Sequence, residues 1–170
     1  MTRQDQIIKW LVYTLALLPV WILDAFLLGR WPLFGTVPLL LPLTVVAVAV
    51  LEGATAGAGF GMGVGLLWAL GYADVGGGMV SFMVVAGMIS GAAAQYALTQ
   101  GFAGCLICST GTLAVLELLR IARGVFIQLA PLPVLLGVAG KELILTLLWS
   151  PAVYFIFLQA FRKVGLDKLA

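Results

Sequence analysis

The chain has 170 residues, of which 63% are hydrophobic and 9% charged, and its mean hydropathy is +1.17. A soluble domain is usually about 45–50% apolar and about 25% charged, so this composition cannot cover a surface that faces water. The net charge of +2 provides no basic footprint for nucleic acid. We therefore expect an integral membrane protein whose partners lie in the lipid bilayer, with no nucleic acid among them.

Six apolar segments follow one another with short connections. They cover residues 7–28, 34–51, 53–70, 79–98, 103–119 and 143–161. A helix of about 20 apolar residues crosses the hydrocarbon core of a bilayer. The first segment is too long for the apolar part of a signal peptide, and "GRWP" follows it instead of a cleavage site. We expect one all-α domain over residues 1–170, with about six transmembrane helices and no extramembrane domain.

Prolines interrupt two of the apolar regions. Pro38 and Pro42 predict a kink in the second segment or a shift of its start. Residues 125–140, "VFIQLAPLPVLLGVAG", are apolar but short, and they contain Pro131 and Pro133. For residues 124–140 we expect a re-entrant, interfacial or broken helix rather than a further crossing.

Basic residues near both ends of the chain predict its orientation. They are Arg3, Lys9, Arg162, Lys163 and Lys168. Because Lys and Arg are enriched in short cytoplasmic loops, six crossings with both termini in the cytoplasm are self-consistent. This topology places Arg120 and Arg123 outside, against the rule, but one further crossing would put the basic carboxyl end outside as well.

A glycine-rich run, "GATAGAGFGMGVG", opens the third segment at residue 53. A dinucleotide fingerprint and a phosphate-binding loop both require spacings that this run lacks. Gly53, Gly57, Gly61 and Gly65 instead recur at i, i+4, which forms a smooth ridge on a helix. Gly59 and Gly63 form a second pair on the roughly opposite face. The ridge predicts close helix packing within the chain or, alternatively, dimerisation or docking of a partner.

The chain offers little material for chemistry. It contains no histidine, and its two cysteines, Cys105 and Cys108, share a helix face three residues apart. A zinc site needs about four ligands, so we interpret the cysteines as small apolar core residues. General acid–base and nucleophilic catalysis lack their usual residues. We expect a protein with no catalytic residues, no cofactor and no metal.

Charges inside or beside the segments are few, and each is a candidate for function. Asp24 lies close enough to Arg30 in sequence to form an interfacial pair. Glu52 lies at the turn before the third segment, where it would either cap that helix or contact a partner. Glu117 and Arg120 have the i, i+3 spacing of a helical ion pair.

Two further pairs of charged or polar residues lie near the ends of segments. Lys141 and Glu142 precede the last segment, where they either reach the membrane surface or line a cavity. The loop "GYADVGGG", residues 71–78, carries Tyr72 and Asp74. We take Asp24, Glu52, Tyr72 and Asp74 as candidate partner or ligand contacts.

An acidic turn, a glycine-rich segment and a last segment with Pro-x-x-Tyr and basic residues at its end form one set of motifs. Its residues are Glu52, Gly53, Gly57, Gly59, Phe60, Gly65, Leu66, Leu67, Pro151, Tyr154, Arg162 and Lys163. Together these motifs resemble the MreD-type rod shape-determining membrane proteins. The chain departs from the family pattern at two places. Residues 61–64 separate Gly-Phe from Gly-Leu-Leu, and Ala69 stands where the family commonly has an Asp, with Asp74 five residues later.

The resemblance implies a non-catalytic scaffold of the bacterial cell-elongation machinery, which builds peptidoglycan and sets rod shape. Such a protein would reside in the cytoplasmic (inner) membrane, as part of the elongasome. It would bind a bitopic MreC-type protein and other membrane proteins of the elongation complex, and it could form homo-oligomers.

The family is also similar in fold to the six-span S components of energy-coupling-factor transporters, so we expect an S-component-like bundle. The alternative function is therefore that of a substrate-binding subunit of a vitamin or micronutrient importer. Its pocket would use Tyr72 and Asp74, with Trp31 or Gln128.

Overall fold

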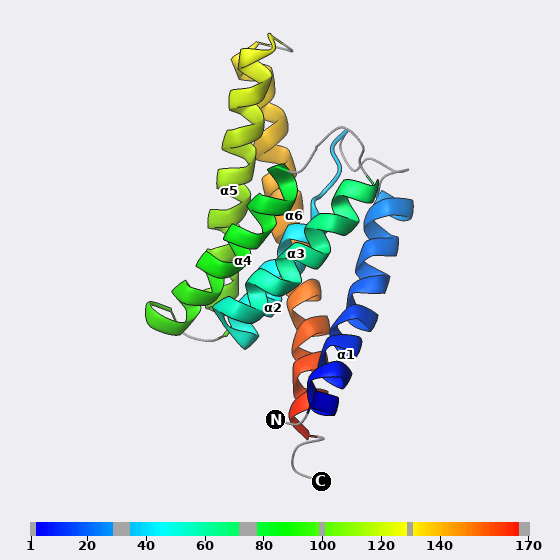
Figure 1. Cartoon of the computed structure of the whole chain (residues 1–170). Coiled ribbons are helices and arrows are strands. Elements are labelled where there is room, and N and C mark those ends of the chain that lie inside the picture. Colours follow the sequence, from blue (N-terminus) through cyan, green and yellow to red (C-terminus); the bar gives the residue numbers. More distant parts are fainter. Residues whose placement is uncertain (1–2, 29–34, 72–77, 99–100, 129–130, 167–170) are drawn as a thin grey trace.

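A computed structural model of the chain describes residues 3–28, 35–71, 78–98, 101–128 and 131–166. Nearly all of this part is helical (Figure 1). In chain order the elements are α1 (Arg3–Ile22), the π-helical turn η1 (Leu23–Leu28), α2 (Leu40–Glu52), α3 (Ala54–Gly71), α4 (Gly78–Tyr96), α5 (Phe102–Phe126) and α6 (Leu132–Leu166). The predicted all-α membrane bundle is confirmed.

Four of the described helices are long and apolar enough to cross a membrane. These stretches are Ile7–Phe26, Gly78–Tyr96, Phe102–Phe126 and Leu132–Lys163. α2 and α3 are shorter apolar helices. α2 has 13 residues and is therefore about 20 Å long, less than a hydrocarbon core of about 30 Å. The chain is a multi-pass membrane protein in which α2 does not reach across the bilayer alone.

α2 is the centre of the bundle. Every residue from Leu40 to Val50 is buried, and α2 contacts all five other α-helices. Its sequence, "LLPLTVVAVAV", is apolar on all sides, as expected for a helix that neighbours surround completely. The other helices leave many of their large apolar side chains exposed, which is the surface that a bilayer would cover.

Consecutive helices run in opposite directions, so the described start of α1 and the end of α6 lie at the same end of the molecule (Figure 1). α3 and α4 form the most extensive helix pair. Gly53 makes the connection from α2 to α3 with a φ of +98°, a backbone conformation that glycine adopts at little cost.

The prolines act differently in the two regions where we expected interruptions. α2 starts at Leu40 rather than near residue 34, so the predicted shift of its start is confirmed. Pro42 lies in the first turn of α2, where a missing N–H breaks no helical hydrogen bond.

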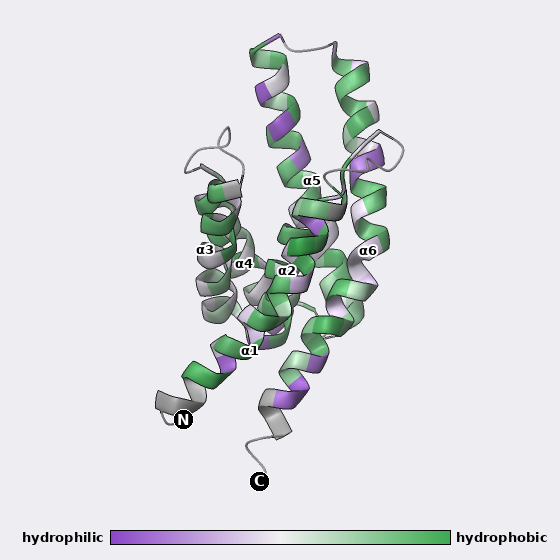
Figure 2. Cartoon of the chain, turned by 90° about the vertical axis from the view of Figure 1, so that its right-hand side faces the viewer, coloured by the Kyte–Doolittle hydropathy of each residue, from purple (hydrophilic) through white to green (hydrophobic). Residues whose placement is uncertain are grey.

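Within residues 124–140 the described helices are interrupted between Phe126 and Leu132, in agreement with the broken-helix alternative, while the re-entrant and interfacial alternatives stay predictions. α5 continues to Phe126 and α6 starts at Leu132, so the described parts of this region are the two arms of one helical hairpin. Pro131 and Pro133 lie at the start of α6, where proline is tolerated. We call residues 124–128 and 131–140 the hairpin tip. Figures 1 and 2 show that it extends past the ends of the other helices.

Candidate functional site

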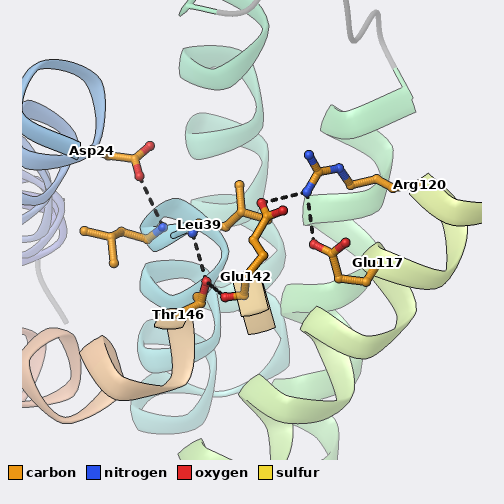
Figure 3. Close-up of polar contacts among 7 residues, drawn as sticks. Asp24, Leu39, Glu117, Arg120, Glu142 and Thr146 are labelled. Carbon is orange, nitrogen blue, oxygen red and sulfur yellow. Dashed lines mark hydrogen bonds and ion pairs between the residues drawn. The ribbon is translucent and has the colours of Figure 1, made fainter. Parts of the chain in front are cut away.

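An ion-pair cluster of three residues joins α5 to α6 next to the hairpin tip (Figure 3). Nη1 of Arg120 donates to Oε1 of Glu117 at 3.0 Å and to Oε1 of Glu142 at 2.7 Å. The two carboxylate side chains are only 9% and 7% exposed, whereas that of Arg120 is 52% exposed. The predicted pair of Glu117 and Arg120 is confirmed. Glu142, which we expected to reach the membrane surface or to line a cavity, is buried and bound to Arg120.

The amino end of α2 is held by side chains from two other elements (Figure 3). The backbone N–H of Leu40 donates to Oδ1 of Asp24, on η1, at 3.3 Å. The backbone N–H of Leu39 donates to Oγ1 of Thr146, on α6, at 3.0 Å. Both donors would otherwise be buried without a helical partner, a state that costs about 1–3 kcal/mol. Asp24 and Thr146 therefore allow α2 to begin inside the bundle.

Thr146 also connects this contact to the ion pair. Its hydroxyl donates to the backbone carbonyl of Glu142, one turn earlier on α6, at 2.6 Å. One face of α6 thus bonds to α5 through Glu142 and to the start of α2 through Thr146. Two successive turns of α6 fix the positions of both neighbouring helices.

A second polar contact closes the opposite end of the bundle. Glu52, the last residue of α2, accepts from Nζ of Lys9 through Oε2 and from the hydroxyl of Tyr13 through Oε1 at 2.8 Å. The Tyr13 ring stacks on Phe157 with a centroid distance of 6.3 Å. A cap on α3 would require the Glu52 carboxylate to bond to the amino end of that helix. The described bonds of this carboxylate go to α1 instead. The contact attaches α1 to both α2 and α6.

The glycine ridge packs inside the chain. A Cβ added at Gly57 would lie 2.6 Å from the backbone carbonyl oxygen of Gly87, and one at Gly65 would lie 2.8 Å from Cα of Val80. One at Gly61 would collide with the backbone carbonyl oxygen of Met83. Gly57, Gly61 and Gly65 of the ridge therefore bring the backbones of α3 and α4 together, and Gly53 lies against the side chain of Gln95. The intramolecular alternative is confirmed for this face.

The opposite face of α3 is open. A Cβ at Gly63 would meet nothing within 4 Å, and one at Gly59 would only touch Trp10 at 3.8 Å. These glycines line an apolar groove of about 210 Å³ between α1 and α3, with Trp10, Thr14, Leu17, Phe60, Val64 and Leu67. We expected close packing through glycine on two faces of α3. The structure shows it only on the face with Gly57, Gly61 and Gly65.

The candidate contacts do not converge on one site. Asp24 and Glu52 lie at the two ends of α2, and each is used in holding helices together. Tyr72 and Asp74 lie outside the described residues, as do Arg30 and Trp31. Gln128 ends the α5 arm of the hairpin tip with a φ of 55°.

No group of three or more His, Cys, Asp or Glu side chains that could hold a metal occurs among the described residues. Cys105 and Cys108 are buried and unpaired with each other. No family model, no curated protein and no solved structure matches the chain. Evidence about function therefore comes from the chain itself.

The two polar contacts lie near the two ends of α2. Asp24 and Thr146 bind the backbone at its start, and Lys9 and Tyr13 bind Glu52 at its end. Lys9, Arg162 and Lys163 lie near the described start of α1 and end of α6, at the same end of the molecule (Figure 1). The arrangement is a helix bundle held together by polar contacts near both ends of its central helix.

Proposed function

We propose that the chain is a non-catalytic scaffold subunit of the bacterial cell-elongation machinery. It resides in the cytoplasmic membrane with both termini in the cytoplasm, because the basic residues Lys9, Arg162 and Lys163 lie near the start of α1 and the end of α6, at the same end of the molecule (Figure 1). The motif resemblance to MreD-type proteins motivates this assignment.

The main support for the scaffold proposal is that the described acidic side chains hold helices together. Each acidic side chain that the structure describes, on Asp24, Glu52, Glu117 and Glu142, takes part in a contact that joins helices. A binding or catalytic site needs polar groups that converge on an open pocket. The groove between α1 and α3 is instead lined mainly by apolar side chains and glycine. Such an arrangement suits a protein that presents fixed helix surfaces to other membrane proteins.

Co-purification from the native membrane tests the proposal against its rival. We expect the affinity-tagged chain to recover a single-span protein with a periplasmic coiled coil, of the MreC type. We also expect cells depleted of the chain to lose rod shape. A vitamin-importer subunit would instead retain a small molecule through purification and bind it saturably. Recovery of a vitamin-loaded protein from cells whose shape does not depend on it would disprove the scaffold proposal.

A Glu52→Gln variant, with Thr14→Val as its control, tests whether recovery of the partner depends on the position of α1. Glu52 holds α1 against α2, whereas the Thr14 hydroxyl only donates to the Trp10 carbonyl of its own helix at 2.8 Å. If the helix surfaces bind the partner, Glu52→Gln should reduce recovery of the single-span protein more than Thr14→Val does. Equal recovery by both variants would show that the position of α1 is irrelevant to the complex.

A further inference from the structure

Two exposed basic side chains lie beside the ion-pair cluster that joins α5 to α6. Arg123 is three residues beyond Arg120 on α5, and Lys141 directly precedes Glu142 on α6. Neither Arg123 nor Lys141 belongs to an ion pair among the described residues. Both lie within helices that are long and apolar enough to cross a membrane. A charge on the lipid-facing surface of such a helix is costly unless an opposite charge compensates it.

Helix geometry places the two charges on the same side of the hairpin. Gly124 on α5 and Glu142 on α6 each face the opposite arm. Arg123 and Lys141 directly precede these residues, which turns each of them back by about 100° around its own helix. Because the two arms run in opposite directions, the same backward turn points to the same side of the pair. One face of the hairpin therefore carries both free positive charges.

Arg120 still has unused hydrogen-bond donors. A guanidinium group can donate through all of its nitrogens. The two described bonds of Arg120, to Glu117 and Glu142, both use Nη1. The other guanidinium nitrogens lie away from the two carboxylates (Figure 3), and the side chain is half-exposed. Arg120 can therefore donate to an acceptor that approaches from outside the bundle.

Exposed apolar side chains adjoin the basic ones along both helices, before and after them in the sequence. They include Leu118, Leu119 and Val125 on α5 and Val138, Ile144 and Leu148 on α6. Figure 2 shows hydrophilic positions on α5 and α6 with hydrophobic ones on either side. Positive charge next to such an apolar surface matches a phospholipid, in which a phosphate is joined to acyl chains.

The balance of charge indicates the class of phospholipid. The cluster and its two neighbours comprise the basic side chains of Arg120, Arg123 and Lys141 and the carboxylates of Glu117 and Glu142. Three positive charges and two negative charges leave an excess of one positive charge. A phospholipid with one net negative charge neutralises this excess, whereas the ammonium group of a zwitterionic lipid would add a positive charge beside it.

We propose that this face of the hairpin binds the headgroup of an anionic phospholipid. Arg123 and Lys141 compensate the charge of the phosphate, and the free donors of Arg120 bind its oxygens. The acyl chains lie along the adjoining apolar surface of α5 and α6. The site uses no partner protein and does not depend on the proposed function.

Native mass spectrometry of the delipidated chain in detergent tests the site. The probes are phosphatidylglycerol, which has one net negative charge, phosphatidylcholine with the same acyl chains, and free glycerol phosphate. We expect phosphatidylglycerol to bind at least about tenfold more tightly than either of the others. Equal binding of the two lipids would overturn the proposal. Binding of glycerol phosphate as tight as that of phosphatidylglycerol would show a site for free phosphate and would overturn lipid as the occupant.

Charge variants locate the binding. Arg123→Gln/Lys141→Gln should weaken the binding of phosphatidylglycerol about tenfold or more, whereas Arg123→Lys/Lys141→Arg keeps both charges and should bind nearly like the unaltered chain. Arg162→Gln/Lys163→Gln is the matched control, because it removes the same charge from the opposite end of α6. Thermal unfolding in lipid-free detergent shows which variants are folded. A control that loses as much binding as the Arg123/Lys141 variant would contradict the site.

A photoreactive phosphatidylglycerol gives a readout on the unaltered chain. With the photoreactive group on an acyl chain close to the glycerol, labelled positions should fall within residues 118–125 or 138–148. Unlabelled phosphatidylglycerol should compete for this labelling, and phosphatidylcholine should not. Labelling confined to other helices, or equal competition by the two lipids, would overturn the proposal.

Discussion

Arg120 on α5 and Glu142 on α6 lie 22 positions apart in sequence, yet their side chains meet at 2.7 Å. Arg120 also binds Glu117, so one guanidinium compensates two buried carboxylates. Removing one partner of a buried ion pair costs about 3–5 kcal/mol because the remaining charge is left uncompensated. The exposure of the Arg120 side chain reduces this cost through solvent screening.

Arg120→Gln should therefore lower the free energy of unfolding by roughly 1–3 kcal/mol. The measurement is thermal unfolding of the purified protein in detergent. Arg123→Gln is the matched control, since Arg123 is exposed and belongs to no described ion pair, and it should change stability by less than about 0.5 kcal/mol. Adding Glu142→Gln to the Arg120 variant should restore part of the loss. Equal unfolding temperatures for the two single variants would contradict the structural role of Arg120.

Gly61→Ala should destabilise the chain because the new Cβ would collide with the Met83 carbonyl oxygen on α4. Forcing extra atoms into a close contact typically costs about 1–3 kcal/mol. Gly63→Ala, two residues away on the open face, meets nothing within 4 Å and should be neutral or slightly stabilising. Thermal unfolding of the two variants compares the faces directly. If Gly63→Ala proves as damaging as Gly61→Ala, the packing of α3 is not as described.

Thr146→Val should leave the Leu39 N–H buried without its acceptor, at a cost of about 1–3 kcal/mol. Valine has nearly the same shape, so the change removes the hydroxyl with its two hydrogen bonds, from the Leu39 N–H and to the Glu142 carbonyl, and keeps the packing. Thr110→Val is the control, because the Thr110 hydroxyl donates only to the Leu106 carbonyl of its own helix and is exposed. Hydrogen exchange should show faster opening at the start of α2 in the Thr146 variant. Unchanged protection there would mean that Thr146 does not hold α2.

Cysteine labelling should locate the two boundaries of the membrane. With a membrane-impermeant maleimide applied to intact spheroplasts, Phe126→Cys should react, and Arg162→Cys should react only after lysis. Leu148→Cys should resist labelling in both conditions, because it faces lipid within the span. The native Cys105 and Cys108 are buried, and the unaltered chain measures their background. Labelling of Arg162→Cys from outside would reverse the proposed orientation.

The sequence predicted those features that depend on local spacing. The glycine ridge follows the helical repeat, so its existence could be inferred from Gly53 to Gly65 alone. The pair of Glu117 and Arg120 likewise follows from an i, i+3 spacing. Helix ends near Gly53 were predicted closely because glycine there ends α2 and permits the turn into α3.

Features that depend on long-range packing could not be predicted. Proline at the first turn of a helix and proline that breaks a helix look alike in sequence, which is why the sequence did not distinguish the hairpin arms around Pro131 from a re-entrant or interfacial helix. The contacts of Glu52 with α1 and of Thr146 with the start of α2 join residues 39 to 107 positions apart. Thr146 gave no signal, since a lone threonine in an apolar helix commonly bonds to its own backbone.

Native mass spectrometry of the chain, extracted together with its membrane neighbours, tests the scaffold proposal most directly. The account predicts a complex whose mass is the sum of the chain and a single-span coiled-coil protein, with no added small-molecule mass. A chain that appears alone with a bound vitamin-sized ligand would contradict it.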